Sequence, residues 1–176
     1  MDKPTTILSN EHQNILKVID ALNKECNLLE KGKDLDKDFL AKAIDFIRNY
    51  ADKFHHAKEE DILFVELGKD TVSMHCNPIE QMLYEHDLGR NFVKGMEAGL
   101  KEGVKEEVIK NARGYAYLLQ DHIFKEDNIL YPMADEALDE SMQDLILNKF
   151  KEAEIKKFNK EIKEKYLSLV EEFENR

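Results

Sequence analysis

Residues 55–64 read HHAKEEDILF and residues 122–131 read HIFKEDNILY, and these two stretches decide how the chain folds. They align without a gap. Both place a histidine, a lysine, a glutamate, an acidic residue, isoleucine, leucine and an aromatic residue in the same order. On an α-helix, a histidine and a glutamate four residues apart lie about 40° apart around the axis and one turn apart along it. Each copy therefore predicts a helix that directs an imidazole and a carboxylate toward one point.

The composition around these repeats is typical of long helices. Only seven glycines and three prolines interrupt the 176 residues, in which Leu, Glu, Lys, Ala and Ile dominate. We therefore expect an all-α fold without a sheet, large enough to bury a core without disulfides. The net charge of -11 argues against nucleic acid or an anionic membrane as a partner, because both require a basic surface.

The beginning of the chain and its cysteines indicate a cytoplasmic protein. The residues after Met1 lack the basic start and apolar stretch of a signal peptide, and no uncharged apolar run has membrane-spanning length. Cys26 falls at an apolar helical position, which favours a reduced thiol in the core over a disulfide.

Helical periodicity and helix-breaking residues divide residues 1–135 into four long helices. The first carries an apolar stripe at Leu8, Ile15, Ile19, Leu22 and Leu29 and stops at residues 31–33. Asp36 is the expected N-cap of a second helix that ends near Leu67, and residues 68–77 read as a loop. Pro78 opens a third helix that ends at Gly103, and a fourth ends near Pro132. This order predicts an up-down-up-down four-helix bundle.

Residues 136–176 are expected to form one or two additional C-terminal helices. They are highly charged but keep regularly spaced apolar residues such as Phe150, Phe158, Tyr166 and Phe173. We expect this extension to pack across the bundle as part of the same domain, or against a second subunit, so that a homodimer remains an open alternative. The charged residues are interpreted as a solvated face.

A metal site is predicted where the four helices face one another. His12 and His86 lie on the apolar faces of the first and third helices, and the repeats add two histidines and two glutamates. A buried glutamate without a partner cation carries a large desolvation cost, which a metal removes. Imidazole with carboxylate suits iron. The predicted ligands are His12, His55, Glu59, His86, His122 and Glu126.

The neighbours of these residues are assigned from the same helical wheel. His55 shares its face with Ile44 and Ala51, whereas His56 shares its face with Asp45 and Glu60, so we assign His56 and Glu60 to positions outside the ligand set. The apolar side chains expected to keep water from the site are Ile62, Met82, Val93 and Ile129.

Arg90 and the tyrosines have more than one reading. The arginine either points inward to pair with Glu97 or an exogenous anion, or forms an ordinary salt bridge on the helix surface. Tyr115, Tyr50 or a loop residue is available to complete the coordination of a metal. His75 and Cys76 are read as solvated loop residues.

Four stretches of the sequence together resemble the hemerythrin HHE cation-binding family. They are Glu11-His12, the repeat at residues 55–64, residues 77–90 (NPIEQMLYEHDLGR) and residues 122–132, and the similarity spans about residues 8–135. The resemblance implies a di-iron centre bridged by Glu59, Glu126 and an oxo or hydroxo group, with the four histidines as terminal ligands. Oxygen-carrying members have a second histidine four residues after the third-helix one, where this chain has Arg90.

The functions that follow from such a centre are binding and redox chemistry. We expect a non-haem di-iron protein that binds or senses a small diatomic ligand, dioxygen or nitric oxide, at an open iron position. The alternatives are an oxidoreductase that reduces peroxide, dioxygen or nitric oxide, and an iron sensor or storage protein. A binding protein is favoured over an enzyme. The sequence contains no signalling or catalytic domain beside the bundle, so the redox or signalling partner is expected to be a separate molecule.

Overall fold

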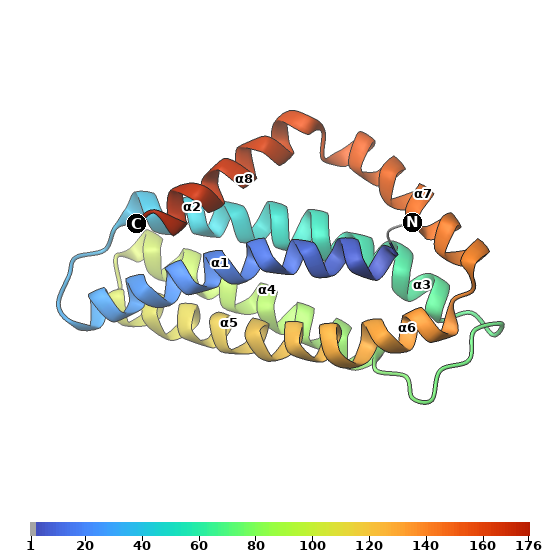
Figure 1. Cartoon of the computed structure of the whole chain (residues 1–176). Helices are drawn as coiled ribbons and strands as arrows, with labels where there is room; N and C mark the ends of the chain where they lie inside the picture. The colour runs from blue at the N-terminus through green and yellow to red at the C-terminus, as the bar shows by residue number, and fades with distance from the viewer. Residues whose placement is uncertain (1–2) are drawn as a thin grey trace.

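A computed structural model describes residues 3–176 of the protein. All regular structure in this range is helical (Figure 1). The all-α prediction is confirmed, and no strand occurs within that range. None of the helices in the described part of the chain is both long and apolar enough to cross a membrane. The elements are α1 Pro4–Glu30, α2 Lys37–Phe46, η1 Ile47–His56, η2 Glu59–Leu63, α3 Phe64–Leu67, α4 Ile79–Glu102, α5 Lys105–Lys125, η3 Glu126–Leu130, α6 Tyr131–Ala137, α7 Glu140–Lys157 and α8 Lys160–Glu174, where η marks a π-helical segment.

Four long helical rods form the bundle: α1, the run from α2 to α3 (the second rod), α4, and the run from α5 to α6 (the fourth rod). Their limits follow from the residues at their ends. Asp36 accepts a hydrogen bond from the amide of Phe39 at 3.1 Å and so caps α2, and Gly103 ends α4 with a φ of 72°. The predicted ends of the first three helices are therefore close to those observed.

π-helical turns interrupt the second and fourth rods at equivalent positions of the two repeats. The segments η2 and η3 cover the same five repeat positions, and η1 adds ten π-helical residues that end at His56. In such segments each amide bonds to the carbonyl five residues earlier, so that the turn is wider than in an α-helix. The fourth rod continues past Pro132 to Ala137, beyond its predicted end, because this proline sits in the first turn of α6, where its missing amide is tolerated.

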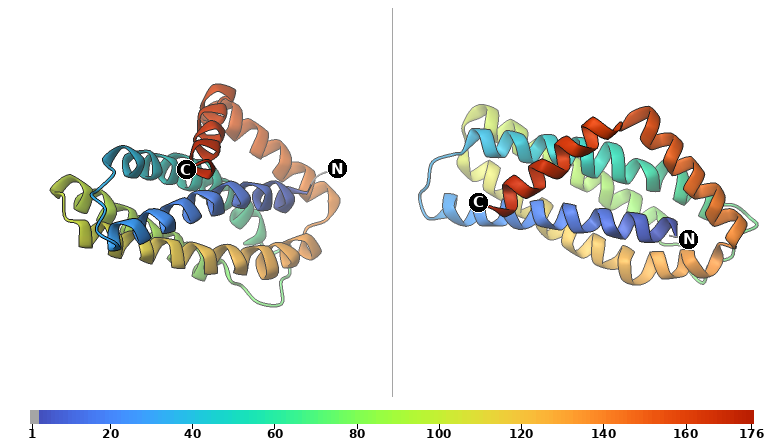
Figure 2. Two further views of the ribbon diagram at one scale, coloured as in Figure 1. Left: turned by 60° about the vertical axis from the view of Figure 1, so that its left-hand side comes forward. Right: turned by 45° about the horizontal axis from the view of Figure 1, so that its top comes forward.

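The C-terminal helices cross the bundle on the side of α1 and the second rod (Figures 1 and 2). α7 contacts α1 and η2, and α8 contacts α1 and α2. Their buried side chains join the core of the bundle, among them Ile146, Phe150, Phe158, Tyr166 and Phe173. The division of the chain at residue 135 stays a prediction.

The buried core consists of two apolar clusters with a polar layer between them. The larger cluster includes Ile15, Ala51 and Leu119, and the smaller one includes Leu8 and Ile62. On each rod, the predicted ligands fall between residues of the larger cluster and residues of the smaller one. The core therefore surrounds one layer of histidines and glutamates with apolar side chains on both sides.

Candidate metal centre

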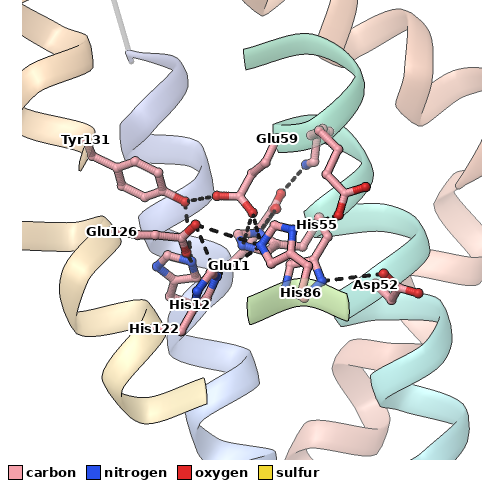
Figure 3. A network of polar contacts seen from close by, with 12 residues as sticks. Glu11, His12, Asp52, His55, Glu59, His86, His122, Glu126 and Tyr131 are labelled. Atoms are coloured by element: carbon pink, nitrogen blue, oxygen red, sulfur yellow. Dashed lines mark hydrogen bonds and ion pairs between the residues drawn. The ribbon is translucent and has the colours of Figure 1, made fainter. Parts of the chain in front are cut away.

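The six side chains predicted as ligands lie together in this polar layer (Figure 3). All six are buried, with exposed fractions of 2% or less. Their ligand atoms fall into two groups, within each of which every atom lies within 4.8 Å of the others. The first group, on the α1 side, contains His12, His55, Glu59 and Glu126, and the second contains His56, Glu59, His86 and His122.

Each of the two glutamates faces both groups. The Oε2 atom of Glu126 lies 3.2 Å from Nε2 of His12, and its Oε1 atom lies 3.2 Å from Nε2 of His122. The Oε2 atom of Glu59 lies 3.7 Å from Nε2 of His55 and 3.5 Å from Nε2 of His86. Both carboxylates therefore occupy the position of a bridge between two sets of imidazoles.

Several polar atoms of the layer are buried without a hydrogen-bond partner. They are Nε2 of His55, Oε2 of Glu59 and both carboxylate oxygens of Glu126. Leaving a buried polar group unpaired costs about 1–3 kcal/mol, and more for a charged one. All of them belong to the predicted ligands, so a cation at the centre would satisfy the groups that the protein leaves unpaired.

The spacing of two histidines also fits a metal. The Nε2 atoms of His86 and His122 lie 3.0 Å apart, while their Nδ1 atoms are held by carboxylates. When each Nδ1 carries its proton, the Nε2 atoms face one another with lone pairs, which requires a cation or a proton nearby. Two ligands about 2.1 Å from one metal and at right angles to each other lie about 3.0 Å apart. The observed spacing is that of two imidazoles bound to one ion.

A carboxylate orients each of the four predicted histidine ligands. The Nδ1–carboxylate distances are 2.9 Å for His12 with Asp127, 3.0 Å for His55 with Glu11, 2.7 Å for His86 with Glu60 and 2.7 Å for His122 with Glu85. Such a contact fixes the tautomer and leaves Nε2 for the metal. The assignment of Glu60 to a place outside the ligand set agrees with this contact. The acidic residue after each repeat glutamate is the sequence signal for Glu60 and Asp127.

The charges at the centre shift several pKa values in the metal-free protein. Burial raises the pKa of Glu59, and the neighbouring charge of Glu126 raises it further. Burial lowers the pKa of His12, but the hydrogen bond to Asp127 and the nearby carboxylate of Glu126 outweigh burial and raise the pKa to about 9. Burial also lowers the pKa of His122, but the carboxylates of Glu126 and Glu85 outweigh burial and raise the pKa to about 10. The layer thus attracts positive charge, which protons supply when no metal does.

The helical wheel placed His56 on the polar face with Asp45 and Glu60, and this placement is wrong. Its side chain is buried, it stacks on His86 with ring centroids 3.8 Å apart, and it joins the second ligand group. The helical wheel assumed 3.6 residues per turn, whereas His56 ends the π-helical segment η1, whose wider turn brings both His55 and His56 to the inner face. Apolar periodicity does not distinguish a π-helical turn from an α-helical one.

Ile129 differs from its expectation, whereas Arg90 follows the salt-bridge reading of the two left open for it. Ile129 is 47% exposed, although Ile62 at the equivalent position of the first repeat is buried. Arg90 pairs with Asp52 and Glu60 at 2.7 Å and with Asp87 at 2.9 Å, whereas Glu97 pairs with Arg48. The arginine is therefore a bridge between α4 and the second rod and does not reach Glu97.

Tyr131, which closes the second repeat, is the tyrosine that reaches the ligands. Its hydroxyl donates to Oε1 of Glu59 at 2.6 Å and lies 3.4 Å from Nε2 of His12. Tyr50 instead accepts a hydrogen bond from Asn14. The shared aromatic position at the end of each repeat was visible in the sequence, but its direction was not.

The family of the chain follows from a comparison with known protein families. The hemerythrin HHE cation-binding domain matches residues 3–134, about three quarters of the chain. The chain therefore belongs to the family of hemerythrin HHE cation-binding domains, as its motifs indicated. No curated protein compared with the chain matches it significantly. The family and the two groups of ligand atoms together support a metal cofactor at this centre.

Proposed function

We propose that the chain holds two iron ions between its four rods and uses them to bind or sense a small diatomic ligand, dioxygen or nitric oxide. The observation that carries this proposal is the inequality of the two ligand groups. The second group offers three imidazoles, and the first offers only two, His12 and His55. With both glutamates shared, an ion held by His12 and His55 has fewer protein ligands and keeps a position for an exogenous one.

Imidazole and carboxylate ligands support iron as the metal, because this mixture of nitrogen and oxygen donors suits it. When bound, ferrous iron would supply the electrons that reversible binding of such a ligand requires. Glu126 would hold both ions through its two oxygens, and the carboxylates on the Nδ1 atoms would keep the histidines in their binding tautomer.

The protein side chains at the His12–His55 position suit an uncharged ligand that accepts a hydrogen bond. Burial raises the pKa of Tyr131, and the charges of Glu126 and Glu59 raise it further, so its hydroxyl keeps its proton. That hydroxyl lies 3.4 Å from Nε2 of His12 and donates its proton to Oε1 of Glu59, so a ligand at the open side would take this hydrogen bond in competition with Glu59. Leu8 and Leu130, both almost fully buried, belong to the apolar cluster that keeps bulk water away.

Anaerobic reconstitution with ferrous iron tests the proposal. We expect two irons per chain and an absorption spectrum that changes on addition of nitric oxide or dioxygen and returns when the gas is removed. Tyr131→Phe should bind two irons but lose the gas ligand faster, and Tyr117→Phe, at an exposed position, serves as its control. Fewer than two irons in the wild-type protein would overturn the proposal.

Two other outcomes would replace it by one of the alternatives. Consumption of peroxide or nitric oxide over many cycles would identify a di-iron oxidoreductase. A large rise in Tm on iron loading without any response to gas would identify an iron sensor or storage protein, because bound metal contributes folding free energy.

A further inference from the structure

A cavity of about 190 Å³ opens beside the metal centre, on the side away from His12. It lies between η1, α4 and α5, and residues of both the second ligand group and the surface line it. One water molecule takes about 30 Å³ in the liquid, so this space holds about six waters or a small polyatomic ligand with some of them. The residues that matter for its chemistry are Arg48, Asp52, His56, Arg90, Lys94 and Tyr115.

Two buried polar atoms point to a ligand in this cavity. Among residues 3–176, six buried side-chain atoms have no hydrogen-bond partner, and four of them belong to the predicted metal ligands His55, Glu59 and Glu126. The remaining two are the hydroxyl of Tyr115 and Nδ1 of His56, and both residues line the cavity. Tyr115 is only 2% exposed, so its hydroxyl has no access to bulk solvent.

Both atoms can donate a hydrogen bond. Burial raises the pKa of Tyr115, and the nearby charge of Asp52 raises it further, so the hydroxyl keeps its proton. The Oδ1 atom of Asp52 lies 3.5 Å from Nδ1 of His56, too far for a good hydrogen bond. Nδ1 of His56 donates a hydrogen bond in the tautomer that places the ring proton on it. Two donors without acceptors therefore flank the same space.

Three cationic side chains, Arg48, Arg90 and Lys94, and one carboxylate, Asp52, line the cavity. Arg48 is neutralised by Glu97, with two contacts of 2.6 Å, and Arg90 is neutralised by Asp52, Glu60 and Asp87. Lys94 has no carboxylate within 4.0 Å among residues 3–176. An uncompensated ammonium group at the mouth is notable in a chain with a net charge of -11.

We propose that this cavity binds a small monovalent anion, which accepts hydrogen bonds from Tyr115 and His56 and is attracted by Lys94. The anion occupies a place behind His56, separate from the open position at His12 and His55. Its chemistry is that of a compact acceptor with three or four heavy atoms, such as a carboxylate or nitrite. The inference rests on the proposed function only in one respect, which is that the anion lies next to a proposed metal ligand, His56. The cavity and the side chains that line it are present without a metal.

Titration with sodium formate, at constant ionic strength, tests this site. We follow the amide resonances of Gly89 and Val93, which line the cavity, in the zinc-loaded and in the metal-free protein. Tyr115→Phe removes only the unpaired hydroxyl and should weaken formate binding by about tenfold or more, as expected for a lost hydrogen bond to a charged group. Tyr117→Phe, at a side chain that is 77% exposed, is the matched control and should leave the Kd unchanged.

Lys94→Gln provides a second variant whose folding is not in question, because this residue is exposed. It should weaken formate binding by about threefold at low salt and by less at high salt, since a surface charge is screened. Lys101→Gln, on the same helix, is its control.

The outcomes separate this inference from the proposed function. An unchanged Kd in Tyr115→Phe, or shifts confined to residues around His12, would overturn the anion site even if the protein binds two irons. Formate binding that depends on Tyr115 in a protein that fails to bind two irons would support the anion site and overturn the di-iron proposal.

Discussion

The two halves of the bundle build the same frame around the centre from different parts of the chain. The first half is α1 with the second rod, and the second half is α4 with the fourth rod. In each half, a glutamate directly before a ligand histidine holds both the histidine and the lysine of the repeat. The two sets are Glu11 with His55 and Lys58, and Glu85 with His122 and Lys125.

The halves also hold one another. The acidic residue after each repeat glutamate reaches across to a histidine of the other half, Glu60 to His86 and Asp127 to His12. The four histidines thus receive equivalent support, and the frame has an approximate twofold symmetry. The histidine–glutamate pairs of the two sequence repeats therefore occupy equivalent positions in the two halves of the bundle.

Two differences break this symmetry. At the position after the repeat histidine the first half has His56, and the second half has Ile123, so only one ligand group gains a third imidazole. Lys58 is 2% exposed and also pairs with Glu154 of α7 at 3.2 Å, whereas Lys125 is 27% exposed. One difference between the repeats and one C-terminal helix therefore make two similar groups of candidate ligands unequal.

The largest expected effect comes from the carboxylate that both halves share. Glu126→Gln should lower metal binding from two ions per chain to one or none, because Oε1 and Oε2 face His122 and His12 at 3.2 Å each. Elemental analysis after reconstitution measures the loss, with the exposed Glu136→Gln as control. Two ions bound to Glu126→Gln with unchanged affinity would contradict the bridging position.

The lysines of the two repeats should differ in their effect on stability. Lys58→Met leaves Glu11 buried without its cation, and breaking a buried ion pair costs about 3–5 kcal/mol. Lys125→Met should cost about 1 kcal/mol or less, since its side chain is partly solvated. Urea unfolding of both variants measures the difference, and equal losses would show that α7 does not shield the first half.

The metal-free protein should lose stability at alkaline pH. The folded pKa values of about 9 for His12 and about 10 for His122 lie above the ordinary value of 6.5, so their contribution is complete below pH 6.5 and is lost as the pH rises through 9 and 10. We expect Tm to fall by several degrees over this range, since 1 kcal/mol corresponds to roughly 2–4 °C for a chain of this size.

The metal-loaded protein is the control for this pH dependence. Because metal binding displaces the protons from both imidazoles, its Tm should not fall through the same range. Thermal unfolding followed by circular dichroism, with and without chelator, measures both curves. A flat curve for the chelated protein would show that the centre does not hold these protons.

A more local effect is expected for the variant that tests the difference between the two ligand groups. His56→Ile gives the first repeat the residue of the second and should weaken binding of one ion by about 10–100-fold while the other stays bound. His75→Ile, in an exposed loop, is the control. Calorimetric titration separates the two ions, and two unchanged affinities would place His56 outside the ligand set despite its buried position.

Much of this organisation was predictable from local sequence. Few glycines and prolines, a cap at Asp36 and apolar periodicity on each helix predict the four rods, since helix limits depend on residues close in the chain. The six predicted ligands meet because each lies on an apolar helical face, and such faces must pack against one another. The histidine and glutamate motifs also indicated that the chain belongs to the hemerythrin HHE cation-binding domain family.

Only the tertiary structure decided the inward direction of His56, the outward direction of Ile129 and the role of α7 over Lys58. The first depends on a π-helical turn, which changes the direction of a side chain without changing the pattern of residue types. The second depends on the surroundings of each repeat, since Ile62 at the equivalent position is buried. The third depends on contacts between residues about 96 positions apart, which no local pattern encodes. The sequence by itself determined which residues could form the centre, and the packing of the rods determined how unequal its two sides are, because that depends on backbone geometry and on long-range contacts.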